Sequence, residues 1–225
     1  MDGVQINRNS KLISLPCRIT VNFRYCCPSF PGIPMTEPAR NIPPPNTAAN
    51  AACHNLPAWL IADLRSDHAG EMGAVMIYRG VLAISRDPDV VNFARHHLAT
   101  EEQHLGRISG LLNVRQQTRL LPLWRVMGWM TGALPTLFGA NAVYATIDAV
   151  ETFVDKHYQE QLDRLDPDGR FGSIRTVLAE CQADEIAHRD EARQLASRRR
   201  GVLLWLWAQV VGSGSAAAVW AARRI

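Results

Sequence analysis

The spacing of hydrophobic residues divides the chain into a start without periodicity and a long helical part. Residues 1–55 show little helical periodicity and carry several prolines, including the run Pro43-Pro44-Pro45, which favours extended or irregular backbone. From Ala58 onward the apolar residues recur at the spacing of an α-helix. We therefore expect a disordered or cleavable extension at 1–55, followed by an all-α domain.

Four long helices are predicted before a fifth, very apolar segment. The first runs from about Ala58 to Arg86, where Asp87-Pro88 resembles an N-cap followed by proline at the first helical position. This pair opens a second helix that extends to about Val114. An Asp-Pro-Asp-Gly sequence at 166–169 is a strong turn signal between the third helix and the fourth. The last three helices are expected at about 140–165, from that turn to about 197, and at 202–222.

Two helical hairpins joined by a long crossover predict a ferritin-like four-helix bundle. We expect this bundle at 56–199, with the crossover at about 115–139. Residues 200–225 are then a C-terminal apolar helix associated with a membrane.

Two segments carry no charged residue and are long enough to span a bilayer, namely Val126–Ile147 and Val202–Ala222. Glycine and proline interrupt the first, and Gly212-Ser213-Gly214-Ser215 interrupts the second. Arginines flank the second segment on both sides and give no orientation signal, while the nearby tryptophans suit a position at headgroup depth. We expect both segments to lie as helices in the membrane surface. The alternative is a transmembrane helix at 202–222.

The composition, 47% hydrophobic and 20% charged, is that of a folded protein, and a net charge of +3 does not indicate a nucleic-acid partner. Four of the five cysteines lie in the first quarter of the chain and none forms a CxxC pair, which favours a reducing compartment. Residues 1–36 hold one acid and four basic residues. They are either a mitochondrial presequence or, as we favour, an extension upstream of a working start at Met35.

Two Glu-x-x-His motifs carry the candidate chemistry: Glu101 with His104, and Glu185 with His188. Residues three apart share one face of a helix, so each motif can direct a carboxylate and an imidazole to the same point. One such motif would mean little. Their placement relative to two other glutamates makes them informative.

Each predicted hairpin brings one glutamate level with one Glu-x-x-His motif. Glu71 lies 16 residues before the turn at Asp87, and Glu101 lies 14 residues after it. At the rise of an α-helix, both are about 21–24 Å from the turn. In the second hairpin, Glu151 and Glu185 are each about 17 residues, or about 25 Å, from the middle of their turn. Four glutamates and two histidines are therefore expected at one level of the bundle.

The neighbours of these residues on each helix face are mostly apolar, for example Leu64, Tyr78 and Leu195. Buried carboxylates are costly unless they are paired or bound to metal. Four carboxylates balance two divalent ions, and two neutral imidazoles complete the di-iron or di-manganese arrangement of this bundle class. An oxygen-rich site without thiolate disfavours structural zinc.

With these residues in place, the chain resembles the demethoxyubiquinone hydroxylase family, the di-iron enzymes of ubiquinone biosynthesis. The resemblance runs from about Leu60 to the C-terminus and rests on short segments. These are Asp67-His68-Ala69-Gly70-Glu71 with Gly73-Ala74 and Ile77-Tyr78, Glu101-x-x-His104, Val150-Glu151, His157-Tyr158, Asp184-Glu185-x-x-His188, and the crossover sequence Pro122-Leu123-Trp124.

The resemblance implies two iron ions per chain and O2-dependent hydroxylation of a demethoxy polyprenyl quinol. It implies the iron ligands Glu71, Glu101, His104, Glu151, Glu185 and His188, with Glu101 and Glu185, or Glu151, bridging the ions. His157 and Tyr158 would support the ligands or act in redox chemistry, with ordinary packing as the alternative. The electrons would come from NADH, a separate reductase or the quinol itself. The implied location is peripheral to a membrane, with the cytoplasmic face of a bacterial inner membrane favoured over the matrix face of the mitochondrial inner membrane.

Other polar residues near the six are open to simpler interpretations. Asp148 is either a hydrogen-bond partner of a ligand imidazole or, as we favour, a surface residue. His68 is either a support for the ligands or a core histidine, and His96 and His97 are expected to have no metal role.

Three other functions remain open. An alternative-oxidase-type quinol oxidase would reduce O2 to water without a hydroxylated product. Ferritin-like iron binding predicts hydrophilic outer faces, and the two long apolar segments argue against this function. If the chain were a metal-free membrane protein, substitution of Glu101 or Glu185 by alanine would change neither its metal content nor its activity.

Overall fold

The structure is a computed structural model that describes residues 56–196 and 201–225. The predictions for residues 1–55 and for the four N-terminal cysteines lie outside these ranges. All regular structure within them is helical, which confirms the all-α fold class. The helices are α2 (Ala58–Ile84), α3 (Pro88–Ser109), the short 3-10 helix η2 (Val114–Gln116), α4 (Leu121–Thr136), α5 (Ala140–Leu162), α6 (Gly172–Leu195) and α7 (Val202–Ala222).

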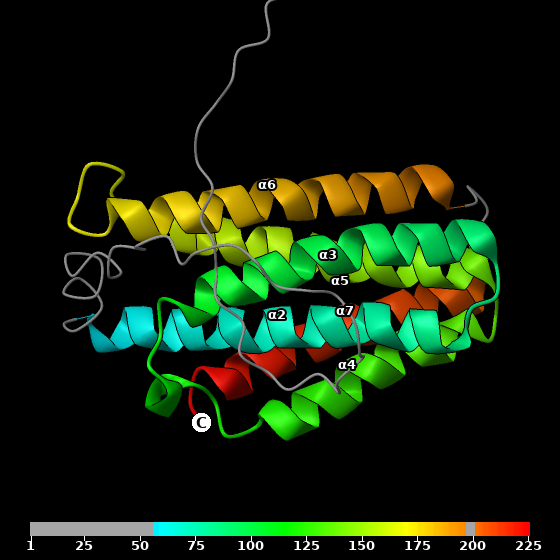
Figure 1. Ribbon diagram of the computed structural model, residues 1–225, viewed down its shortest axis with the longest axis horizontal. Coiled ribbons are helices and arrows are strands. Elements are labelled where there is room, and N and C mark those ends of the chain that lie inside the picture. Colours follow the sequence, from blue (N-terminus) through cyan, green and yellow to red (C-terminus); the bar gives the residue numbers. More distant parts are fainter. Residues whose placement is uncertain (1–55, 197–200) are drawn as a thin grey trace, which may run out of the picture. The chain divides into compact units, whose positions relative to one another are not determined.

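The four long helices α2, α3, α5 and α6 form two hairpins that pack side by side (Figure 1). The boundary between α2 and α3 is where the sequence predicts it, because the Asp87 carboxylate accepts the backbone N–H groups of Asp89 at 2.9 Å and Val90 at 3.4 Å. The predicted end of α3 at Val114 is wrong. The helix ends at Ser109 and the chain turns before entering η2.

The hydrophobic core consists of two clusters, one towards each end of the bundle. One contains Tyr78, Phe93 and Ile147, and the other contains Leu64 and Leu178. Each of the four long helices carries a buried glutamate near its middle. The residues before that glutamate belong to one apolar cluster, and the residues after it belong to the other. The two apolar clusters therefore enclose a polar layer at the middle of the bundle.

The crossover contains a helix of its own, α4, and the segment Val126–Ile147, expected to lie as a helix in the membrane surface, is divided between α4 and α5. Helix α4 ends at Thr136. Gly139 adopts a φ of +93°, and this turn of the backbone separates α4 from α5. Among the described helices, α7 is the one whose length and composition would allow it to cross a membrane.

Glycines bring α4 into backbone contact with α2. A Cβ atom at Gly132 would lie 1.9 Å from the carbonyl oxygen of Ile77, and one at Gly128 would lie 2.5 Å from that of Gly73. On the opposite helix, a Cβ at Gly80 would lie 2.2 Å from the carbonyl oxygen of Trp129. These glycines therefore allow α4 to lie directly against the helix that carries Glu71.

Helix α7 lies along α2 and α5 and is fixed at two points. The indole N–H of Trp207 donates to the Thr146 hydroxyl at 2.8 Å, and the Arg223 guanidinium lies 3.0 Å from the Asp63 carboxylate. Much of its other side is exposed, with 83% of Leu203 and 60% of Trp220 accessible to solvent. Leu195 at the end of α6 is also exposed, contrary to its predicted core position.

Candidate metal centre

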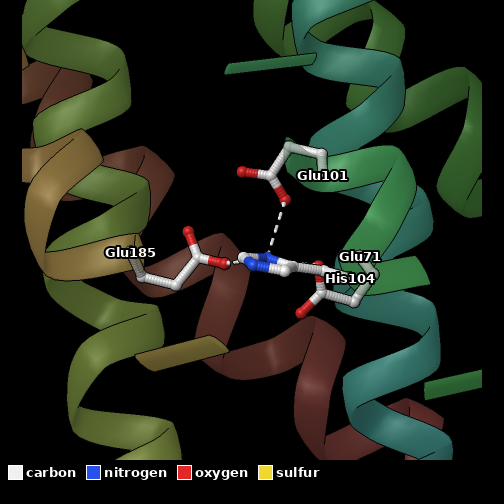
Figure 2. A group of neighbouring side chains, drawn as sticks. All are labelled: Glu71, Glu101, His104 and Glu185. Atoms are coloured by element: carbon white, nitrogen blue, oxygen red, sulfur yellow. Dashed lines mark hydrogen bonds and ion pairs between the residues drawn. The ribbon is translucent and has the colours of Figure 1, made fainter. Parts of the chain in front are cut away.

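The six residues singled out in the sequence meet at the centre of the bundle. They come from four helices: Glu71 from α2, Glu101 and His104 from α3, Glu151 from α5, and Glu185 and His188 from α6. Each side chain is almost completely buried. The equal heights predicted from helical rise are therefore observed, and Figure 2 shows four of the six directed towards one another.

The six residues form two overlapping sets of four. Glu71, Glu101, His104 and Glu185 offer ligand atoms that all lie within 4.8 Å of one another. Glu101, Glu151, Glu185 and His188 do the same. Glu101 and Glu185 belong to both sets, so their carboxylates stand where groups shared by two metal ions would stand.

Both histidines direct the same ring nitrogen into the cluster. His104 Nδ1 lies 3.0 Å from a Glu185 oxygen and 3.7 Å from a Glu71 oxygen. His188 Nδ1 lies 3.0 Å from a Glu101 oxygen and 3.3 Å from the second oxygen of Glu185. Both Nδ1 atoms therefore face the space between the carboxylates. His104 belongs to one set of four and His188 to the other.

The electrostatics of the metal-free cluster are unfavourable. Burial and the neighbouring charges of Glu185 raise the pKa of Glu101 and Glu151 well above the usual range, and raise that of Glu71 to about 7. Burial alone would also raise the pKa of Glu185, but hydrogen bonds with His104 and His188 lower it to about 2. Burial would lower the pKa of His104, but the carboxylates of Glu185, Glu71 and Glu101 raise it to about 10.

The donor set fits metal ions better than it fits protein hydrogen bonds. Neither oxygen of Glu101 has a hydrogen-bond partner among the described residues, and one oxygen each of Glu71, Glu151 and Glu185 also lacks one. Buried oxygens in this state cost free energy unless a cation satisfies them. Four carboxylates and two imidazoles match two divalent ions in charge and in ligand type. The cluster can therefore bind metal.

Two further groups hold the cluster residues in position. The second ring nitrogen of His104, Nε2, lies 3.0 Å from the carboxylate of Asp184, which is half-exposed. The phenolic hydroxyl of Tyr158 donates a hydrogen bond to Glu71. A carboxylate behind a ligating imidazole fixes its tautomer and ring orientation. The contact of Asp184 with His104 spans 80 residues, so the local motif Asp184-Glu185-x-x-His188 does not indicate it.

His157 contacts none of the six residues through a hydrogen bond or ion pair, unlike its neighbour Tyr158. Its Nε2 lies 2.9 Å from Asp67 Oδ1, and Gln161 donates to the same oxygen at 2.6 Å. Ser66 Oγ lies 3.3 Å from the same ring nitrogen. His157 is thus part of a buried polar group between α2 and α5, one helical turn from Glu71.

Of three other polar residues, Asp148 departs from the favoured surface position, whereas the buried positions of His68 and His97 agree with the interpretations given for them. Asp148 is buried, not at the surface, and accepts a hydrogen bond from Arg193 at 2.6 Å. His97 lies outside both sets of four but is buried with its ring 4.1 Å from that of His188. His68 is also buried, and burial lowers its pKa. The sequence could not indicate these environments, because each is made by side chains from other helices.

A cavity of about 660 Å³ leads from the cluster to the outer surface. The carboxylates of Glu71, Glu101, Glu151 and Glu185 line its inner end, and Tyr158 lies beside them. Its outer wall is mainly apolar and comes from α4 and α7. The outer lining includes Leu123, Trp124, Met127, Leu134, Val210 and Ala217.

The fold and the cluster define a ferritin-like helical bundle with a buried carboxylate and histidine centre able to bind metal. The chain belongs to the family described as ubiquinone biosynthesis protein COQ7, whose model matches residues 58–222. This finding confirms the resemblance drawn from the motifs.

Curated relatives support the same family. The chain is 36% identical over 165 residues to a 3-demethoxyubiquinol 3-hydroxylase of Rhodospirillum rubrum, covering 72% of this chain and 76% of that protein. It is 29% identical over 169 residues to a mitochondrial NADPH-dependent 3-demethoxyubiquinone 3-hydroxylase of Dictyostelium discoideum, with the same coverage of 72% and 76%. It is 33% identical over 162 residues to the mitochondrial 5-demethoxyubiquinone hydroxylase of Saccharomyces cerevisiae, covering 62% and 69%.

Proposed function

We propose that this chain is a di-iron monooxygenase that uses O2 to hydroxylate a demethoxy polyprenyl quinol in ubiquinone biosynthesis. The ligands are Glu71, Glu101, His104, Glu151, Glu185 and His188, and they hold two iron ions per chain. Glu101 and Glu185 would serve both halves of the site, since each belongs to both sets of four. The names of the relatives as hydroxylases of demethoxyubiquinol support the substrate class.

The observation that carries this proposal is the continuity of the apolar cavity with the carboxylate cluster. A quinol with a polyprenyl tail is nearly insoluble in water, so its enzyme must receive it from lipid and keep the tail away from water. The cavity presents an apolar wall of α4 and α7 for the tail, and four glutamates at its inner end for the head group. A mineral-storing protein would have no use for such a wall.

Bound iron would supply the activation of O2, and the residues of the chain would control the surroundings of the reaction. Insertion of one oxygen atom into a ring C–H bond, with the other leaving as water, consumes two electrons and two protons. Tyr158 orients Glu71 through its hydrogen bond, and Asp184 orients His104. Burial of all six side chains excludes water from the reacting atoms.

The electrons would come from outside the chain. Relatives from Dictyostelium discoideum and Mus musculus are named NADPH-dependent, which supports a nicotinamide nucleotide as the reductant, used directly or through a reductase. We propose the cytoplasmic face of a bacterial inner membrane as the location, with the matrix face of the mitochondrial inner membrane as the alternative, since relatives of both kinds match the chain. Helix α7 would lie in the membrane surface, because Trp207 and Arg223 hold it along the bundle.

The test is anaerobic reconstitution of the full chain with ferrous iron, followed by O2, a reductant and a demethoxy quinol. Iron per chain and product mass are followed together. We expect about two irons per chain and a product heavier by one oxygen atom, labelled when 18O2 is used. Oxygen consumption without hydroxylated product would favour a quinol oxidase, and iron loading far above two would favour storage.

The matched variants are Glu101→Gln and Glu102→Gln, which are adjacent on α3. Glu101 is buried in both ligand sets, whereas Glu102 is exposed and paired with Arg79 at 2.7 Å. We expect the first substitution to abolish iron binding and product formation, and the second to leave both within about twofold, since exposed ion pairs contribute little. Equal effects of the two substitutions would contradict the proposed ligand set.

A further inference from the structure

A second cavity, of about 910 Å³, lies where α4 begins and α7 ends. Four arginines line it: Arg65, Arg115, Arg119 and Arg224. They come from α2, from the segment between α3 and α4, and from the end of α7, so residues far apart in the sequence create this positive site together. In Figure 1 the C-terminal end of the chain lies close to the loop that leads into α4.

The positive charge of this cavity is almost unbalanced. No aspartate or glutamate is among its lining residues, and none of the four arginines forms an ion pair with a carboxylate within the described ranges. Arg223 and Arg164, which lie nearby, are both paired with Asp63. The backbone N–H of Arg119 donates to the main-chain oxygen of Ile225 at 3.5 Å, which joins the segment before α4 to the segment after α7.

The surrounding backbone adds to the attraction for anions. Leu121 and Pro122, the first residues of α4, also line the cavity. The N-terminus of this 16-residue helix has no side-chain cap and no acidic residue in its first turn. Arg65 is held in place because its Nε donates to the carbonyl oxygen of Gln116 at 2.6 Å. Unsatisfied N–H groups at a helix start and fixed arginines both suit the oxygens of a phosphate.

The position of the cavity indicates which phosphate would bind. Beyond the start of α4 the next residues expose apolar side chains, with 50% of Leu123 and 60% of Val126 accessible. On α7 the Arg224 guanidinium lies 4.0 Å above the ring of Trp220, whose exposed fraction is 60%. Arginine and tryptophan beside an apolar surface are typical of headgroup depth in a membrane.

We propose that the cavity lined by Arg65, Arg115, Arg119 and Arg224 binds the phosphate of an anionic phospholipid headgroup. Binding there fixes the first turn of α4 and the last turn of α7 on the bilayer. The neighbouring residues Trp124 and Ala221 line the apolar cavity that leads to the carboxylate cluster, so the same contact holds that cavity against the lipid. This inference does not depend on the metal centre.

The experiment measures partition of the full chain onto vesicles of phosphatidylcholine alone or of phosphatidylcholine with phosphatidylglycerol, at fixed ionic strength. The test variant is R115Q/R119Q. Arginines at a membrane surface each contribute about fivefold to affinity for anionic lipid, so we expect a loss of about 25-fold on the mixed vesicles. Binding to phosphatidylcholine vesicles should change by less than about twofold.

The matched control is R86Q/R95Q, which removes the same charge from exposed positions near and on α3. We expect it to retain affinity for the mixed vesicles within about twofold. An equal loss in both double variants would mean that diffuse charge attracts the chain, and would overturn the proposal. The single variant Arg224→Gln, at the exposed end of α7, should lose about fivefold and serves if the double variant fails to fold by circular dichroism.

A soluble arm separates the two sources of phosphate. Binding of NADPH and of inorganic phosphate is measured for the unmodified chain and for R115Q/R119Q. If the double variant loses soluble ligand but keeps its vesicle affinity, the site serves a soluble phosphate compound and the lipid proposal is wrong. If it loses vesicle affinity alone, the headgroup assignment is supported.

Discussion

His104 and Asp184 form a direct connection between the buried cluster and the protein surface. One imidazole nitrogen of His104 faces the carboxylates at the centre, and the other lies 3.0 Å from the Asp184 carboxylate. Asp184 is half-exposed whereas His104 is buried. A partly exposed carboxylate thus favours one tautomer and one ring orientation of a buried imidazole in the cluster.

Asp184→Asn is expected to weaken metal binding without unfolding the chain. Loss of the carboxylate removes the group that keeps the proton on His104 Nε2 and leaves Nδ1 free for metal, an effect of about 10–100-fold in affinity. Ferrous iron affinity is measured by anaerobic titration. Asp190→Asn on the same helix is the control, since that residue is exposed and contacts arginines only. An unchanged affinity for Asp184→Asn would show that His104 does not need this partner.

The metal-free chain should lose stability as the pH rises from 7 to 9. Burial raises the pKa of Glu101 and Glu151 well above the usual range, so these carboxyls bind protons more readily in the native state than in the unfolded chain. His104, with a pKa of about 10, does the same. Since the native state binds more protons, the free energy of unfolding falls with pH, by about 1.4 kcal/mol per unit for each such proton. His68 and His97 do not contribute, because their lowered pKa leaves them neutral in both states above pH 7.

The metal-loaded chain should show a much flatter dependence over the same range. Bound metal requires deprotonated carboxylates and neutral imidazoles, so the protons that cause the slope are absent. Denaturant unfolding of both forms at pH 7, 8 and 9 measures the difference. Parallel slopes in the two forms would mean that the cluster protons do not account for the pH dependence.

Ala217→Leu is expected to impair use of the quinol and to leave metal binding unchanged. Ala217 lines the apolar cavity that leads to the cluster, and the added side-chain atoms would fill space that the prenyl tail would occupy. We expect KM for a long-tailed quinol to rise about tenfold, corresponding to one or two lost methylene contacts. Ala216→Leu is the control, because the adjacent residue makes the same chemical change outside that cavity. With a short-tailed quinol, the KM values of the two variants should differ less.

Gly132→Ala should destabilise the fold through the contact between α2 and α4. Its Cβ would lie 1.9 Å from the Ile77 carbonyl oxygen, so one helix must move. Overpacking of this kind costs about 1–3 kcal/mol or more. Gly212→Ala on α7, where the same atom would meet nothing within 4 Å, should instead be neutral or stabilising by up to about 1 kcal/mol. Thermal unfolding of both variants measures this contrast.

The sequence predicts the centre of the bundle well because helical geometry is regular. Once the turn at Asp87 is recognised, the fixed rise per residue sets the heights of Glu71 and Glu101, and the cap is local to the turn itself. The predicted end of the second helix is too late, because Leu111 and Leu112 continue the helical spacing beyond Gly110, the residue that forms the C-cap.

Features that depend on contacts between distant segments could not be predicted in this way. The glycines of α4 look like interruptions of an apolar segment until Ile77 is found against Gly132. Asp148 looks like a surface acid until Arg193, 45 residues later, is found beside it. Helix periodicity gives the face on which a residue lies, and partners from other helices decide its environment.

The cavity joins two parts of the chain that are otherwise separate in the sequence. The candidate ligands belong to α2, α3, α5 and α6, whereas the outer wall comes from α4 and α7. On the proposed function, substitutions at the wall positions within residues 121–136 and 202–222 would change which tail lengths the cavity admits while the candidate ligands stay unchanged.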